Sequence, residues 1–256
     1  MNHYLLWLRY DGTRFHGWQR QLGVRTVQGT LEEGLTHLLN GNFRLLTSSR
    51  TDAGVHAIRH PVILNTSSKI PIHGLLRGLN SLLPTDLAVV ETRRVPNTFS
   101  TRKDAIGKVY RYKILEDRFA DPFLTPFCWR LDEHLDITAM RKAARILYGQ
   151  HDFAAFRSAH CDSVTTIRQI TGIFITRKPP LTTITIGGNA FMRNMVRIIT
   201  GTLVTIGRGQ KPVSWMADVL AEKDRSQAGL TAPAQGLFLV GVNYPAHHYC
   251  NGAHEF

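Results

Sequence analysis

The residue best suited to chemistry is Asp52, in a short polar turn over residues 49–56 that follows a predicted strand. An ionised carboxylate can act as a nucleophile or as a proton acceptor. Arg50, two residues earlier, can neutralise or orient it. An aspartate two residues before a glycine is also the usual composition of a simple turn, so this segment alone fits both a structural and a catalytic interpretation.

Two further cations, Arg193 and Arg197, are expected on a helix that begins at Ala190. Apolar residues recur there at helical spacing, and the two arginines stand one turn apart on the opposite side. Each arginine is either an ordinary surface charge or a positive partner for a carboxylate.

Basic and aromatic residues are concentrated between residues 93 and 113. The segment contains seven basic residues against one acid: Arg93, Arg94, Arg102, Lys103, Lys108, Arg111 and Lys113, and Asp104. Phe99, Tyr110 and Tyr112 lie among them. Because cations hold phosphates and aromatic faces stack on bases, this mixture favours binding of single-stranded or flipped-out nucleotides. The same composition fits a solvated β-hairpin edge with two tyrosines in the core.

The whole chain is strongly basic. Its 256 residues include 31 Lys and Arg but only 19 Asp and Glu, a formal charge of +12. This balance favours an anionic partner, nucleic acid first. The longest apolar stretches, residues 5–8 and 202–206, are too short to cross a bilayer. Three cysteines and an N-terminus without a signal-peptide pattern predict a cytoplasmic protein.

Motifs for cofactors and metals are missing from the sequence. It contains no phosphate-binding glycine loop, no dinucleotide fingerprint and no Cys/His cluster with zinc-ligand spacing. His56 and His60 are four residues apart but in a turn or strand context, and the histidines after Pro245 belong to a predicted flexible tail. We therefore expect neither a metal nor a cofactor.

These residues are expected on two similar halves, each of order β-α-β-β-α-β. The patterns predict strands over residues 4–10, 43–48, 62–65, 87–95, 109–115, 166–176, 181–186 and 237–242, and helices over 26–39, 71–83, 136–148, 214–223 and onward from 190. The predicted fold class is mixed α+β: two ferredoxin-like halves form one extended, mainly antiparallel sheet, with helices on one face and a cleft between the halves. The predicted division is 1–100, which carries Asp52, then 101–245, and a tail over 246–256.

Together these segments resemble the tRNA pseudouridine synthase A family over almost the whole chain. Residues 50–57, Arg-Thr-Asp-Ala-Gly-Val-His-Ala, resemble the catalytic loop of that family. Other segments resemble further family blocks: residues 10–19, 26–29, 110–112, 151–157, 189–197 and 232–237. Several blocks in the right order are far more specific than any one tripeptide.

The resemblance implies a cofactor-free isomerase that converts uridine to pseudouridine and binds RNA in the cleft. It implies that Asp52 is the essential aspartate, that Tyr110 stacks on the uracil and that Arg197 pairs with Asp52. Arg50 would help to displace the target base, and Leu237 would pack the pocket. Independently of the resemblance, the basic segment and the predicted helix offer Arg102, Lys103, Lys108, Arg111 and Arg193 as further RNA contacts. The family commonly acts as a homodimer on uridines 38–40 of the tRNA anticodon stem-loop.

The sequence also departs from the family pattern. Ser49 replaces a usual glycine, His60-Pro61 stands where glutamine and valine are common, and residues 99–104 alter a more aromatic block. Three alternatives stay open: a paralogue with another RNA target, a noncatalytic RNA-binding or RNA-folding protein, and a nuclease. Retention of the aspartate, tyrosine and arginine together argues against the noncatalytic alternative.

Overall fold

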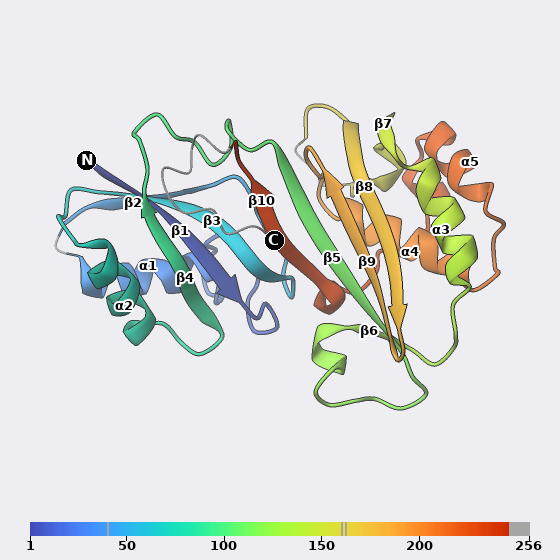
Figure 1. The fold of residues 1–256 in the computed structure, drawn as a ribbon, viewed down its shortest axis with the longest axis horizontal. Coiled ribbons are helices and arrows are strands. Elements are labelled where there is room, and N and C mark those ends of the chain that lie inside the picture. The colour runs from blue at the N-terminus through green and yellow to red at the C-terminus, as the bar shows by residue number, and fades with distance from the viewer. Residues whose placement is uncertain (40, 160, 162, 246–256) are drawn as a thin grey trace. The chain divides into compact units, whose positions relative to one another are not determined.

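A computed structural model describes residues 1–39, 41–159, 161 and 163–245 (Figure 1). The chain forms two compact units. Unit 1 contains residues 1–107 together with the described residues from 239 onward, and unit 2 contains residues 108–238. The predicted tail over residues 246–256, including its histidines, lies outside the described residues.

Unit 1 follows the predicted order β-α-β-β-α-β. Its elements are β1 (Asn2–Tyr10), α1 (Val27–Leu38), β2 (Phe43–Thr47), β3 (His56–Thr66), α2 (Ile72–Leu82) and β4 (Leu87–Arg94). Strand β1 pairs antiparallel with both β3 and β4, and β2 pairs antiparallel with β3. The last strand of the chain, β10 (Leu237–Asn243), begins in unit 2 and ends in unit 1.

The helices of unit 1 begin and pack as their sequences predict. Thr26 caps α1, because its side chain accepts a hydrogen bond from the Gly29 N–H. Pro71 precedes the first turn of α2, where a missing N–H costs nothing. A Cβ atom at Gly78 would lie 2.6 Å from Leu38 Cδ1, so the glycine permits close approach of α2 to α1.

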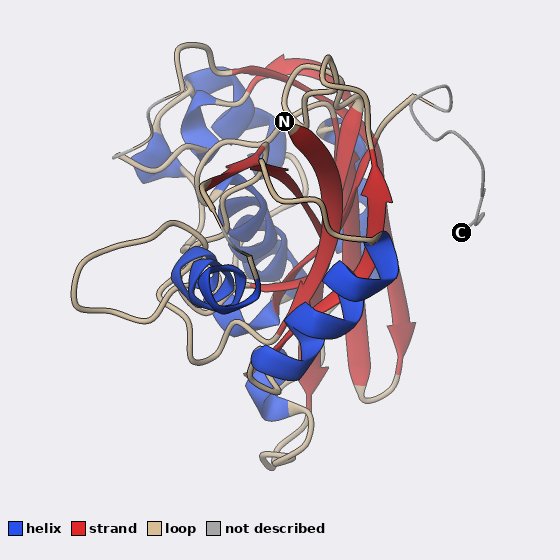
Figure 2. Cartoon of the chain, turned by 90° about the vertical axis from the view of Figure 1, so that its left-hand side faces the viewer, coloured by secondary structure: helices blue, strands red, loops and turns tan. Residues whose placement is uncertain are grey.

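Unit 2 contains the predicted elements and two additional short strands. Its elements are β5 (Gly107–Glu116), β6 (Trp129–Leu131), α3 (Ile137–Ile146), β7 (Gly149–Asp152), β8 (Ile167–Lys178), β9 (Leu181–Gly188), α4 (Met195–Gly207) and α5 (Trp215–Glu222). The strand order β5-β9-β8-β7 is antiparallel throughout, whereas β6 pairs parallel with β5. Figure 2 distinguishes the helices, in blue, from the strands, in red. The mixed α+β class and the mainly antiparallel pairing are therefore confirmed.

Two elements start five or more residues away from the predicted position. Strand β3 starts at His56 rather than near residue 62, because Pro61 is accommodated inside the strand opposite Trp7 of β1. Helix α4 starts at Met195 rather than Ala190, because Asn194 adopts a left-handed conformation with φ of 62°. Met192 is nevertheless buried, so the apolar periodicity continues into a segment that is not helical.

Candidate active site

Asp52 lies in the loop that connects β2 to β3, and its side chain is half-buried. The N-terminal segment after β1 holds this loop through the backbone. The Trp18 N–H donates to the Thr51 carbonyl at 3.0 Å, and the Gly54 N–H donates to the Phe15 carbonyl at 3.2 Å. These two hydrogen bonds flank Asp52 on either side. The backbone beside the carboxylate is therefore fixed by a segment distant in sequence.

Two glycines of the N-terminal segment make this close contact possible. A Cβ atom at Gly12 would lie 2.1 Å from the Val55 carbonyl oxygen, and one at Gly17 would lie 2.6 Å from the Thr51 carbonyl oxygen. Gly17 also has φ of +87°, a conformation that side chains rarely adopt. Sequence reasoning included both residues in a family block without giving them a role.

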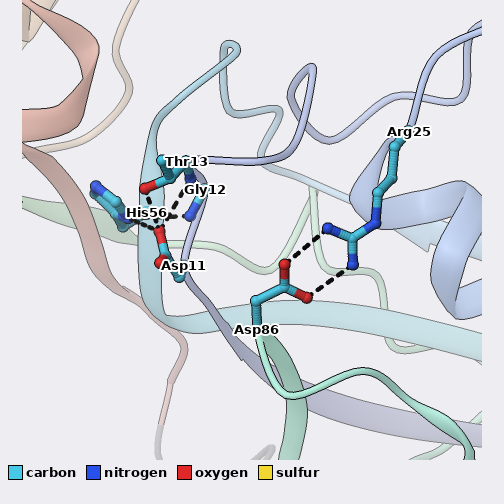
Figure 3. Close-up of polar contacts among 6 residues, drawn as sticks. All are labelled: Asp11, Gly12, Thr13, Arg25, His56 and Asp86. Carbon is cyan, nitrogen blue, oxygen red and sulfur yellow. Dashed lines mark hydrogen bonds and ion pairs between the residues drawn. The ribbon is translucent and has the colours of Figure 1, made fainter. Parts of the chain in front are cut away.

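Polar groups around the buried His56 fix the start of the same segment. Figure 3 shows Asp11, Gly12 and Thr13 gathered around His56. Asp11 Oδ1 accepts from the Thr13 N–H and hydroxyl, and lies 3.1 Å from His56 Nδ1. The Gly12 N–H reaches the same His56 nitrogen at 3.0 Å. The two contacts compete, because the amide requires a lone pair on Nδ1 and the carboxylate requires a proton there.

A bidentate ion pair connects the other end of the segment to Asp86, the residue before β4. Arg25 places its two terminal nitrogens 2.7 and 2.8 Å from the two oxygens of Asp86, as Figure 3 shows. Hydrogen bonding from Arg25 lowers the pKa of Asp86 from its ordinary value, while burial acts in the opposite direction. The Arg25 guanidinium also lies 4.1 Å from the centre of the Phe15 ring. A bidentate ion pair of this kind both stabilises the contact and fixes the relative orientation of the two side chains.

The residues that precede Asp52 differ in their surroundings. Arg50 is exposed, whereas Ser49 is 1% exposed. The Ser49 N–H donates to Thr47 Oγ1 at 3.3 Å, but its own buried hydroxyl makes no hydrogen bond to the described part of the chain. Ser49 is not one of the described residues with positive φ. The backbone at this position therefore does not require the glycine common in the family.

The two predicted tyrosines of unit 2 have different environments. Tyr110 and Tyr112 are two residues apart on β5 and share one face of the strand. Tyr112 is fully buried, and its hydroxyl donates to the Pro233 carbonyl at 2.7 Å. Burial raises the pKa of Tyr112 far above its ordinary value, and Arg197 opposes that shift. Tyr110 is only half-buried and meets the Phe191 ring edge to face at 5.2 Å.

Arg197 is a held side chain rather than a mobile surface charge. It lies in the first turn of α4, half-buried. Its Nε donates to the Ala232 carbonyl at 2.6 Å and its Nη1 donates to Asn194 Oδ1 at 2.9 Å. Arg193 was predicted one turn before it on the same helix, and this was wrong: Arg193 precedes the helix and is exposed.

The segment before β10 packs against this arrangement. A Cβ atom at Gly236 would lie 2.6 Å from Tyr112 Cζ, so only glycine allows the segment to lie flat on the ring. Leu237 follows as the first residue of β10 and is 6% exposed. Three family blocks, residues 110–112, 189–197 and 232–237, thus meet inside unit 2.

The predicted basic contacts do not all lie on one surface. Arg102 and Lys103 are exposed in a turn whose backbone N–H groups donate to Ser100 Oγ. Lys108 is on the Tyr110 face of β5, whereas Arg111 is on the opposite face because strand side chains alternate. Phe99, expected among the stacking aromatics, is instead buried against Tyr244 with ring centres 5.2 Å apart.

Among the residues that the structure describes, no group of three or more histidine, cysteine, aspartate or glutamate side chains could hold a metal ion. No helix in the described ranges is long and apolar enough to cross a membrane.

Comparison with known proteins identifies the family. A family model described as tRNA pseudouridine synthase matches residues 7–102 and 143–245. A protein named tRNA pseudouridine synthase A from Geobacter sp. (strain M21) is 44% identical over 96% of this chain and 100% of its own length. Proteins of the same name are 42% identical in Syntrophotalea carbinolica, over 93% of this chain and 94% of theirs, and 39% identical in Thermoanaerobacter sp. (strain X514), over 95% and 100%. The chain therefore belongs to the tRNA pseudouridine synthase family of RNA-modifying isomerases.

Proposed function

We propose that this protein converts uridine to pseudouridine in the tRNA anticodon stem-loop, at positions 38–40, with Asp52 as the catalytic carboxylate. The observation that carries the proposal is the anchoring of the Asp52 loop. Both flanks of Asp52 are hydrogen-bonded to the N-terminal segment, and its side chain is half-buried. A carboxylate that is already fixed in position loses little conformational entropy when it approaches the reacting atom.

The reaction is an isomerisation and needs no redox partner or group donor. The bond between ribose carbon 1′ and uracil nitrogen 1 breaks, the uracil turns while bound, and a new bond forms between carbon 1′ and carbon 5. The proton of carbon 5 leaves, and nitrogen 1 gains a proton. Asp52 acts at the sugar as nucleophile or as proton acceptor, and either role requires the ionised carboxylate.

The proposal assigns three residues of unit 2 to the same uridine. Tyr110 stacks on the uracil, Arg197 pairs with Asp52, and Leu237 packs the pocket. Their assignment comes from the family resemblance, and the surroundings of the side chains are compatible with it. Tyr110 keeps exposed surface while Tyr112 does not, and the Arg197 guanidinium is held in one orientation by Ala232 and Asn194.

Basic residues of both units contact the RNA backbone in this proposal. They are Arg102, Lys103, Lys108, Arg111 and Arg193. Arg50 is exposed beside the loop and can act as a wedge that displaces the target base, because a paired or stacked base must leave the helix before chemistry. We further propose that the protein acts in the cytoplasm as a homodimer. The location in the cytoplasm and the homodimer are proposed from the sequence and from the family resemblance.

The test is tritium release from tRNA labelled at carbon 5 of uridine. Wild-type protein should release label from tRNA, and Asp52→Asn should lower the rate by about 10²–10⁴-fold, the usual contribution of a general acid or base. Asp52→Asn should still bind tRNA. The exposed carboxylate Asp132 provides the matched control, and Asp132→Asn should keep the wild-type rate.

Each alternative predicts a different result in the same experiment. A paralogue would release label from another RNA but not from nucleotides 38–40 of tRNA. Mapping of pseudouridines in cells with and without the protein would identify that other RNA. A noncatalytic RNA-binding protein would bind tRNA and release no label. A nuclease would cleave the labelled transcript.

A further inference from the structure

A row of buried polar side chains connects the loop of Asp52 to the middle of the unit 1 sheet. Thr51 Oγ1 lies 2.8 Å from the Tyr10 hydroxyl, which lies 2.8 Å from His60 Nδ1. The other ring nitrogen of His60, Nε2, lies 2.9 Å from Thr47 Oγ1, and that hydroxyl donates to the Pro61 carbonyl at 2.8 Å. Tyr10 and Thr51 are buried, and His60 is 0% exposed.

For a neutral His60 ring, the direction of every hydrogen bond in this row follows from its last member. A carbonyl only accepts, so the Thr47 hydrogen points to Pro61 and the Thr47 oxygen accepts from His60 Nε2–H. Nδ1 of the neutral ring then carries a lone pair and accepts from the Tyr10 hydroxyl. The Tyr10 oxygen accepts in turn from Thr51. We call Thr51, Tyr10, His60 and Thr47 the relay, because the direction of each hydrogen bond fixes the direction of the next one.

Trp18 supports the relay at two points. Its ring lies against the His60 ring, with centres 4.4 Å apart and planes 38° apart. Its backbone N–H donates to the Thr51 carbonyl at 3.0 Å. Thr51 is thus held by its carbonyl and by its side chain, and both contacts lead back to His60. Because Thr51 precedes Asp52 directly, its position sets the position of the carboxylate.

We propose that the relay positions Asp52 for the isomerisation and that His60 is a positioning residue at its centre. The inference rests on the function proposed above. His60 contributes one acceptor and one donor on opposite sides of a rigid ring, and that pair of groups is what the Tyr10 and Thr47 hydroxyls require. Hydrogen-bonded side chains in a row polarise one another, so the loss of one member weakens the rest.

The first variant to test is Tyr10→Phe, which removes a hydroxyl and leaves the ring. We expect kcat for tritium release to fall by about tenfold to a hundredfold, because a misplacement of ~1 Å can cost on the order of 100-fold. KM and tRNA affinity should stay within about twofold. The matched control is Tyr4→Phe, since Tyr4 is another fully buried tyrosine of β1 whose hydroxyl donates to the Ile70 carbonyl at 2.8 Å. Tyr4→Phe should keep the wild-type kcat.

Variants of His60 separate positioning from packing. His60→Leu fills space but offers neither donor nor acceptor, and should lower kcat as much as Tyr10→Phe. His60→Gln offers an amide oxygen and an amide N–H, and should recover most of the lost kcat. The double variant Tyr10→Phe with His60→Leu should be no slower than either single variant, because residues of one network are not additive.

The outcomes are distinguishable. If wild-type protein releases no tritium, the proposed function fails. If wild type is active and Tyr10→Phe keeps the wild-type kcat, the relay does not position Asp52. Equal activity of His60→Gln and His60→Leu, or an equal loss in Tyr4→Phe and Tyr10→Phe, also overturns the inference. Thermal unfolding of each variant shows whether the protein is folded at the assay temperature.

Discussion

The loop around Asp52 in unit 1 and the segment around Arg197 in unit 2 hold their charged residues in different ways. The loop has no regular structure, and it is fixed by backbone hydrogen bonds from a segment more than thirty residues earlier in the chain. Arg197 lies in the first turn of a helix, and two neighbouring oxygen atoms fix its side chain directly.

This difference shows where each region is vulnerable. In unit 1 the position of Asp52 depends on residues that touch no substrate, such as Gly17 and Tyr10. In unit 2 the helix supplies the backbone position, so the side chain of Arg197 and its two acceptors matter most. Changes to the supporting residues should therefore lower turnover or stability in unit 1, and changes to the charged group itself should lower turnover in unit 2.

Apart from Asp52→Asn, the largest effect is expected for Arg197→Gln. Removal of a fixed cationic donor should lower kcat on the order of 100-fold, with little change in the free energy of unfolding. Arg193→Gln is the matched variant, since Arg193 is only four residues away but exposed outside the helix. It should weaken tRNA binding and leave kcat nearly unchanged. Equal loss of kcat in the two variants would contradict the conclusion that the fixed Arg197 and the exposed Arg193 have different roles.

The next effect is expected for Gly17→Ala in unit 1. Its φ of +87° and the Thr51 carbonyl 2.6 Å from the new Cβ atom should together lower the free energy of unfolding by ~2 kcal/mol or more. Gly23→Ala is the control, because Gly23 has a similar φ of +76° but nothing within 4 Å. That variant should lose only about 1 kcal/mol. Urea unfolding measures both, and equal losses would show that the Thr51 contact is unimportant.

The smallest effect concerns the ion pair of Arg25 and Asp86. A carboxylate whose pKa is lowered on folding stabilises the protein above its unfolded pKa, near 4, and this contribution is lost as the pH falls through the folded value. Because Arg25 is 37% exposed, we expect Asp86→Asn to lower the free energy of unfolding by ~1 kcal/mol or less at pH 7. The difference from wild type should shrink below about pH 4.

The control for this ion pair is Glu32→Gln. Glu32 pairs with Arg20, whose side chain is 72% exposed, so its removal should cost less than removal of Asp86. Urea unfolding at several pH values compares the two variants. A difference between Asp86→Asn and wild type that grows as the pH falls would contradict the lowered pKa of Asp86.

The sequence by itself determined the order of the elements and the residues that begin the first helices. Alternating and helical apolar patterns are local, and so are the cap at Thr26 and the proline before α2, which is why these features could be predicted. The family blocks also singled out Asp52, Tyr110 and Arg197, and the catalytic roles of these residues stay predictions.

Only the tertiary structure decided which members of each segment remain accessible. Tyr110 and Tyr112 look alike in sequence, but the Pro233 carbonyl and Gly236 bury Tyr112. Arg193 and Arg197 have the spacing of one helix face, yet the left-handed turn at Asn194 separates them. In both cases the deciding contact comes from a residue distant in sequence or from a backbone conformation that leaves the apolar periodicity unchanged.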